Sequence, residues 1–155
     1  MGIAFLTKKD APMKTLKQLL ASKHQPLAAV SPKDTVLHAL QLMAEHDVGA
    51  LLVLEGERLV GIFSERDYAR KIILHGKASK ETLVSEIMTD KVFYVEPERS
   101  IDECMAIMSE KHFRHLPVLD DAQQVVGIVS IGDLVKETIR EQQFIIHQLE
   151  RYITG

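Results

Sequence analysis

The sequence contains two copies of one pattern, and this duplication constrains the fold more than any other feature. The run Val30-Ser31-Pro32 recurs as Val95-Glu96-Pro97, and Val60-Gly61-Ile62 recurs as Val126-Gly127-Ile128. The spacing is kept between these landmarks, apart from one extra residue in a turn of the second copy. An internal repeat of this kind predicts two copies of one supersecondary unit.

Each copy predicts the same order of elements, β-α-β-β-α. Apolar residues recur at helical spacing after each proline, and two short apolar runs separated by a polar turn follow. The predicted extended pieces, helices and strands are 27–30, 35–46, 50–54 and 60–63 in the first copy and 92–95, 100–111, 116–119 and 125–129 in the second, each copy ending in a helix after Ser64 or Ser130.

We therefore expect an α+β fold with a leading helix over 15–22 and a long helix at the C-terminus. The predicted organisation is an N-terminal segment at 1–23, a first repeat at 24–76, a linker at 77–84, a second repeat at 85–140 and a helical extension at 141–155. Ser100 with Glu103 forms a capping-box pattern, and Gly76 is placed to end a helix.

The last helix is predicted to continue to about Tyr152, well past the point where its counterpart in the first repeat ends. Its apolar side chains keep a helical stripe over this extension. The stripe favours a helix pair between two copies of the chain, in a homodimer. Packing against the chain's own N-terminal helix is the alternative.

Composition excludes several classes of protein. The single cysteine, Cys104, cannot form an internal disulfide, and the formal net charge of −3 with no tryptophan disfavours a nucleic-acid-binding surface. The longest apolar run, Val48 to Leu54, is far shorter than the roughly 20 residues of a transmembrane helix. We expect a soluble, cytoplasmic protein.

Enzyme chemistry is not predicted. Cys104 lies on the apolar face of a predicted helix, where a cysteine acts as a small hydrophobic side chain. The glycines form neither a dinucleotide-binding nor a P-loop motif. His112 and His115 lack the further ligands of a zinc site. We expect no catalytic residues, no metal site and no obligatory cofactor.

The repeated motifs resemble a tandem pair of cystathionine-β-synthase-type (CBS) domains, known as a Bateman module, over roughly residues 15–140. The resemblance rests on two Gly-Ile-x-Ser-x-x-Asp motifs and two flanking runs, and the stretch Ser64–Lys71 is similar to small stand-alone bacterial members. These motifs are Gly61–Asp67, Gly127–Asp133, Arg114-His115-Leu116-Pro117-Val118 and Ser85-Glu86-Ile87-Met88-Thr89.

This resemblance implies two β-α-β-β-α units related by a pseudo-twofold axis, with two equivalent clefts. Family members bind AMP, ADP, ATP, NAD(H) or S-adenosylmethionine there, usually to regulate and not to catalyse, and commonly form dimers. The expected function is an adenine-nucleotide sensor of energy or redox state that acts on a separate, unidentified protein. A dimerisation scaffold with degenerate clefts is the alternative.

Four residues are the first candidates for nucleotide contact: Ser64, Asp67, Ser130 and Asp133. Each serine lies where a strand turns into a helix, and free amides at such an end attract phosphate. Each aspartate could accept hydrogen bonds from a ribose. The alternative is that serine only caps and aspartate only complements the helix dipole.

Four basic residues are further candidates. Arg114 and His115 resemble phosphate-contacting positions of the family, or else form a solvated junction before a strand. The first repeat has Gly49-Ala50 there, so Arg66 and Arg70, on the helix after Ser64, could compensate or lie on a solvated face.

The resemblance also implies an extended segment whose backbone faces adenine in each cleft, and an apolar residue that covers the base. In one cleft these segment residues are Thr89, Lys91, Val92 and Tyr94, and in the other they include Lys23 and His24. Val36 and Ile101, at the starts of the two first helices, are the candidates for covering the base, or else ordinary core residues.

Overall fold

The computed structural model describes residues 14–23 and 27–154 of the chain. They belong to two compact units whose bounds do not follow the sequence repeats. Unit 1 comprises 1–24, 96–116 and 129–155, and unit 2 comprises 25–95 and 117–128. Each unit is described by itself.

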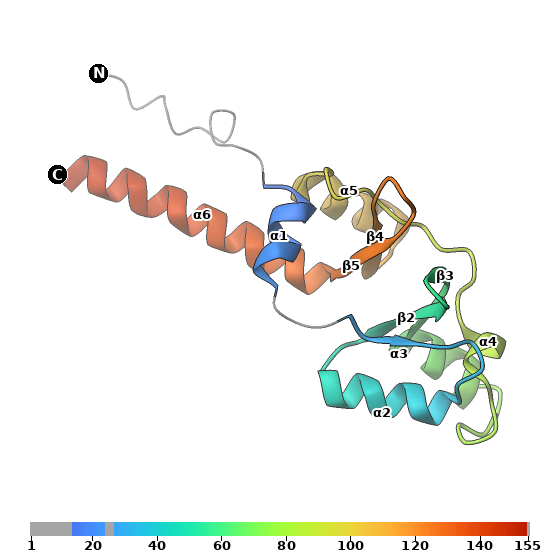
Figure 1. The fold of residues 1–155 in the computed structure, drawn as a ribbon. Coiled ribbons are helices and arrows are strands. Elements are labelled where there is room, and N and C mark those ends of the chain that lie inside the picture. The colour runs from blue at the N-terminus through green and yellow to red at the C-terminus, as the bar shows by residue number, and fades with distance from the viewer. Residues whose placement is uncertain (1–13, 24–26, 155) are drawn as a thin grey trace. The chain divides into compact units, whose positions relative to one another are not determined.

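Unit 2 holds the first repeat in the predicted order. Strands β1 (Ala29–Val30), β2 (Ala50–Glu55) and β3 (Arg58–Ser64) form a sheet in that order, with β1 parallel and β3 antiparallel to β2. Helix α2 (Val36–His46) joins β1 to β2 (Figure 1). Its Val36, Ala39 and Met43 are buried because they share one face at helical spacing.

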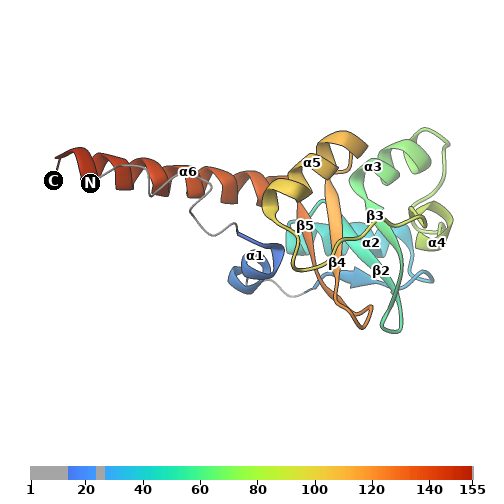
Figure 2. The same cartoon turned by 90° about the horizontal axis from the view of Figure 1, so that it is seen from above.

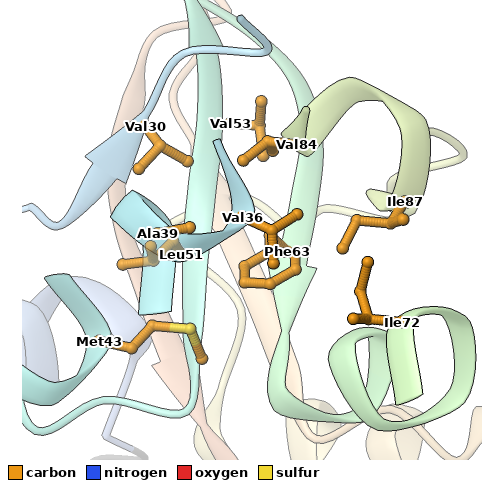
Figure 3. Close-up of a cluster of buried hydrophobic side chains, with 10 residues drawn as sticks. All are labelled: Val30, Val36, Ala39, Met43, Leu51, Val53, Phe63, Ile72, Val84 and Ile87. Carbon is orange, nitrogen blue, oxygen red and sulfur yellow. The ribbon is translucent and has the colours of Figure 1, made fainter. Parts of the chain in front are cut away.

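The core of unit 2 lies between α2, the sheet and the chain that follows β3. Figure 3 shows Val36 and Phe63 at its centre, with Ile72 and Ile87 beside them. Both central side chains have no exposed surface. Burial of such side chains stabilises the unit by about 25 cal/mol per Å² of apolar surface removed from water.

The helix predicted after Ser64 has an irregular form. One α-helical turn, α3 (Glu65–Asp67), leads into a π-helical segment, η2 (Tyr68–Ile73). Gly76 ends it with a φ of 66°, as predicted, and the amides of Gly76 and Lys77 donate back to the carbonyls of Ile73 and Ile72. The short helix α4 (Val84–Ile87), not predicted, adds two side chains to the core.

Unit 1 combines the leading helix with the two helices of the second repeat: α1 (Leu16–Ser22), α5 (Ile101–Lys111) and α6 (Ile131–Thr154). The cap of α1 is joined to the cap of α5, because the Leu16 amide donates to the Arg99 carbonyl at 3.0 Å and the Ile101 amide to the Lys14 carbonyl at 3.1 Å. Lys14 also forms an ion pair with the buried Glu137 of α6.

The strands of the second repeat, β4 (His115–Leu119) and β5 (Val125–Ser130), form a two-stranded sheet as predicted. The boundary between the units passes through both strands. The extended piece expected at 92–95 pairs at Val95, which bridges Val118 in parallel.

The two repeats use the same backbone contacts at equivalent positions. Asp47 and His112 both adopt left-handed conformations at the ends of α2 and α5. The next amides, of Val48 and Phe113, then donate to the carbonyls of Met43 and Met108, both at 3.1 Å. The duplication is therefore visible in helix termination as well as in element order.

The capping box predicted at Ser100 is half formed. Ser100 Oγ accepts from the Glu103 amide at 3.1 Å, but the Glu103 carboxylate pairs with Arg99 instead of returning to the Ser100 amide. A nearby arginine offers a charge-assisted hydrogen bond, which is stronger than one from a neutral amide.

Cys104 is fully buried in unit 1. Burial, with a contribution from Glu103, raises the pKa of its thiol to about 11, so the thiol stays protonated near neutral pH. No helix within the described ranges combines the length and apolar character that crossing a bilayer needs.

Gly61 allows the segment after α4 to lie directly against β3. Ile62 and Thr89 exchange two backbone hydrogen bonds, of 2.9 and 2.8 Å. A Cβ atom on Gly61 would lie 2.6 Å from Met88 Sδ and 3.0 Å from the Thr89 carbonyl oxygen. The backbone contact is the harder one to relieve.

We predict that Gly61→Ala lowers the free energy of unfolding by about 1 to 3 kcal/mol, since it overpacks this contact. Urea denaturation followed by circular dichroism measures the change. Gly132→Ala is the matched control, because its Cβ would lie at an ordinary 3.6 Å from Ser130 Oγ, within a helix. Equal stability of Gly61→Ala and the parent would contradict the prediction.

Candidate functional site

In unit 2, Ser64 and Asp67 cap α3 reciprocally at the end of β3. Ser64 Oγ accepts from the Asp67 amide at 3.2 Å. Asp67 Oδ2 accepts from the Ser64 amide and from the Ser64 hydroxyl, both at 3.0 Å. The pair converts a strand into a helix within three residues.

The other oxygen of Asp67 is also occupied. Oδ1 accepts from the Thr89 hydroxyl at 3.1 Å and lies 3.4 Å from Lys71 Nζ, which donates in turn to the Ile87 carbonyl at 2.9 Å. The Asp67 side chain is only 11% exposed. We call Ser64, Asp67, Lys71 and Thr89 the Asp67 cluster; its carboxylate has four donors around it.

In unit 1, Ser130 and Asp133 repeat this arrangement at the end of β5. Ser130 Oγ accepts from the Asp133 amide at 3.1 Å, and Asp133 Oδ2 accepts from the Ser130 amide and from Lys23 Nζ, both at 2.9 Å. Asp133 Oδ1 accepts no hydrogen bond from the part of the chain that the structure describes. The side chain is 26% exposed.

Hydrogen bonds stabilise the ionised form of the Asp133 carboxyl. Burial alone would raise the pKa of its carboxyl, but hydrogen bonds from the Ser130 amide and the Lys23 ammonium outweigh burial and hold the pKa below its ordinary value. Near neutral pH this group is a charged acceptor, and no residue of 14–23 or 27–154 donates to its Oδ1.

Arg114 lies beside this motif. Its backbone carbonyl accepts the amide hydrogen of Ile131, the first residue of α6, at 2.8 Å. Gly49 makes the equivalent contact in the first repeat, to the Glu65 amide at 3.1 Å. We call Lys23, Arg114, Ser130 and Asp133 the Asp133 cluster; the arginine has no counterpart in the Asp67 cluster.

The remaining predicted residues are more scattered. Arg70 is exposed on η2, and Arg66, partly buried on α3, already has an interaction partner. His115 begins β4 and also has a partner. His24 lies outside the described residues.

The segment after Thr89 is only in part as expected. Both backbone groups of Thr89 are engaged with Ile62, so they are not open to a base, and its hydroxyl is held by Asp67. Lys91, Val92 and Tyr94 form no backbone–backbone hydrogen bond with any described residue. The Tyr94 hydroxyl donates to Gln123 Oε1 at 3.1 Å.

Val36 and Ile101 are core residues. Val36 has no exposed surface, and Ile101 is 3% exposed. Each is the first residue of its helix and points into its unit because the capping residue before it fixes the start of the apolar face. The interpretation of these two side chains as covers for a base is not supported.

Lys71 is the one member of the Asp67 cluster that was not predicted. It ties α4 to the motif by bonding both Asp67 and the Ile87 carbonyl. The sequence contained a signal for this contact. Asp67 and Lys71 are an acid and a base four residues apart, and such a pair shares one helix face.

Asp133→Asn is predicted to change the pH dependence of stability. Because the folded pKa is lowered, the carboxylate contributes stability above its unfolded pKa, near 4, and loses it as the pH falls through the folded pKa. The urea midpoint of the parent should exceed that of Asp133→Asn at about pH 6, and the difference should shrink by about pH 2.5. A difference that stays constant with pH would refute this prediction.

Comparison with known proteins assigns both repeats to one family. The CBS domain matches residues 16–74 and 84–140. The CBS domain-containing protein CBSX3, mitochondrial, of Arabidopsis thaliana is 42% identical over 127 residues, which are 79% of this chain and 61% of that protein. The chain thus spans less than two thirds of this relative.

Solved structures agree. A protein with CBS domains from Burkholderia ambifaria is 51% identical with a TM-score of 0.79, over 83% of this chain and 96% of that one. The CBS domain pair of protein MJ0100, in complex with 5-methylthioadenosine and S-adenosyl-L-methionine, is 25% identical with a TM-score of 0.72, over 82% and 97%.

CBS pairs are regulatory, ligand-binding modules, and this chain shares its fold with solved CBS-domain structures. The chain therefore belongs to the CBS-domain family and carries two CBS domains in tandem.

Proposed function

We propose that the chain is a non-catalytic sensor that binds AMP, ADP, ATP or NAD(H) and reports energy or redox state to a separate protein in the cytoplasm. The observation that carries the proposal is the Asp133 cluster. A charged carboxylate with one open oxygen lies at the N-terminus of a long helix, next to an arginine.

The chemistry of this cluster suits a nucleotide. Asp133 Oδ1 can accept a hydrogen bond from a ribose hydroxyl while Lys23 keeps Oδ2 paired. The amide of Gly132, in the first turn of α6, has no carbonyl one turn earlier in the helix and can donate to a phosphate. The Arg114 side chain, exposed at the same end of α6, can pair with that phosphate.

The second cluster suits the same ligand less well. Both Asp67 oxygens already accept hydrogen bonds, so a ribose would have to displace the Thr89 hydroxyl. Beyond Thr89, the backbone groups of Lys91, Val92 and Tyr94 are available to the edge of an adenine. We infer that both clusters bind, and that the Asp133 cluster binds more tightly.

The relatives support an adenosine-containing ligand. The MJ0100 domain pair was solved with two ligands that each contain adenosine, and it shares the fold over most of this chain. We extend this ligand class to the present chain because the ribose acceptor recurs in both repeats.

A thermal-shift panel with AMP, ADP, ATP, NAD⁺, NADH and S-adenosylmethionine tests the proposal. A ligand at 100 times its dissociation constant stabilises by about 2.7 kcal/mol, or roughly 5 to 10 °C for a chain of this size. We expect such a shift with at least one nucleotide. A flat panel, with protein shown to be free of co-purified nucleotide, would reject the sensor.

The variants should separate the two clusters. Asp133→Ala is expected to weaken nucleotide binding at least about tenfold, the cost of one lost hydrogen bond to a charged group. Asp67→Ala should weaken it less and destabilise the ligand-free protein more, since it removes the acceptor of the Thr89 hydroxyl and the ion-pair partner of Lys71. Isothermal titration calorimetry measures the affinities, and Asp121→Ala, in the exposed β4–β5 turn, is the control. The reverse order of effects would contradict the assignment.

A dimerisation scaffold is the second candidate function. Exposed apolar side chains on α6 favour it, among them Ile146 at 54% and Ile153 at 80% exposure. We propose a homodimer under either function, and a flat ligand panel would leave the scaffold as the function to pursue.

A further inference from the structure

Helix α6 carries an apolar seam with a seven-residue period. Isoleucine recurs at 139, 146 and 153, and the interleaved series 135, 142 and 149 holds valine, glutamine and leucine. The spacing alternates between four and three residues, as in positions a and d of a coiled coil. We call the following residues the α6 seam: Val135, Ile139, Gln142, Ile146, Leu149 and Ile153.

The seam is not the face that packs within unit 1. Leu134 and Glu137 are buried, and the Thr138 hydroxyl contacts Met105 of α5. Successive residues of an α-helix are rotated by about 100° around the helix axis. The seam begins one residue after the buried Leu134, so it faces about 100° away from the buried face of α6. Its isoleucines are 48%, 54% and 80% exposed from residue 139 onward.

The residues that flank α1 contact the start of α6. Lys14 and Lys23 pair with Glu137 and Asp133. Figures 1 and 2 both show α1 beside the first turns of α6 and the rest of α6 continuing beyond it. The alternative expected from sequence, packing of the apolar stripe on the N-terminal helix, stays a prediction for the extension of α6.

The residue types of the seam favour a second copy of the same helix. The d positions hold Val135, Gln142 and Leu149, and isoleucine at each a position with leucine at d favours two parallel strands. Gln142 then faces its own copy, and each amide can donate to and accept from the other. An antiparallel pair that keeps the seam in contact places Gln142 against Ile146, which leaves the amide unpaired.

The residues that flank the seam, at positions e and g of the heptad, also permit a parallel pair. In a parallel pair Ile145 lies opposite Glu150 of the other copy, and Thr138 lies opposite Gln143. No two like charges meet at these positions. The seam extends over less than three heptads, so we expect a pair that dissociates on dilution.

We propose that α6 pairs with α6 of a second copy as a parallel, in-register, two-stranded coiled coil in which the two Gln142 side chains face each other. The proposal specifies the helix and the register of the homodimer named above, and it does not depend on nucleotide binding. Its test is therefore made on ligand-free protein.

Disulfide trapping of Gln142→Cys tests the register. In the parallel pair the two positions lie within the Cα separation that a disulfide allows, about 4.4 to 6.8 Å. Mild oxidation with a glutathione buffer should give a covalent dimer on non-reducing electrophoresis. The parent should give none, because Cys104 is buried and its thiol is protonated.

Phe144→Cys is the matched control, since Phe144 is 59% exposed but lies on the opposite side of α6 from the seam. We expect its cross-linking to be at least about tenfold slower, because its thiols exceed the disulfide separation in the pair. Ile146→Asp added to Gln142→Cys should abolish the covalent dimer, while Phe144→Asp should not. Circular dichroism confirms that each variant is folded.

Three outcomes would overturn the proposal. Equal trapping of Phe144→Cys and Gln142→Cys would indicate random collision. Trapping only in a mixture of Gln142→Cys with Ile146→Cys would indicate an antiparallel pair. No trapping, with a dimer mass by light scattering, would place the dimer interface elsewhere.

Discussion

The reciprocal hydrogen bonds between a serine and an aspartate three residues later shape both repeats. In each copy the serine hydroxyl accepts from the aspartate amide while the aspartate accepts from the serine amide. These contacts end a strand and begin a helix, and they pair the backbone amides of the serine and of the aspartate. They also place a carboxylate and free helix amides at one point, which is the chemistry that a ribose phosphate needs.

The duplication preserved this geometry but not its surroundings. Both oxygens of Asp67 are occupied, by Ser64, Thr89 and Lys71, whereas among the described residues only Oδ2 of Asp133 is, by Ser130 and Lys23. The two sites therefore share one motif but differ in how many existing hydrogen bonds to the carboxylate a ligand must displace. In a two-site sensor, such a difference makes occupancy graded over ligand concentration, since the sites fill in sequence.

Helix α6 links the two proposed activities. Its first turn carries Asp133, and the exposed seam follows on the same continuous helix. A ligand at the N-terminus and a second copy along the seam would thus act on one rigid element. Any coupling between them requires that nucleotide binds the paired and unpaired states with different affinity.

Much of this protein was determined by sequence alone, because local rules sufficed. Helical periodicity and capping residues located α1, α2, α5 and α6, and the repeated Gly-Ile-x-Ser-x-x-Asp motif that begins at Gly61 and at Gly127 revealed the tandem family pair. Short-range hydrogen bonds are set by residues three or four positions apart, so a linear pattern contains them.

Tertiary structure decided what depends on residues distant in the chain. Whether Val36 covers a ligand or fills the core, whether Glu103 returns to its own cap or pairs with Arg99, and whether Asp67 stays open or is closed by Thr89 are choices between competing partners. Each side chain takes the partner that packing brings within hydrogen-bonding reach, and a burial that leaves polar groups unpaired is too costly. Local sequence defines which partners are chemically possible; only the folded chain brings Lys23 to Asp133, at a separation of 110 residues in the sequence.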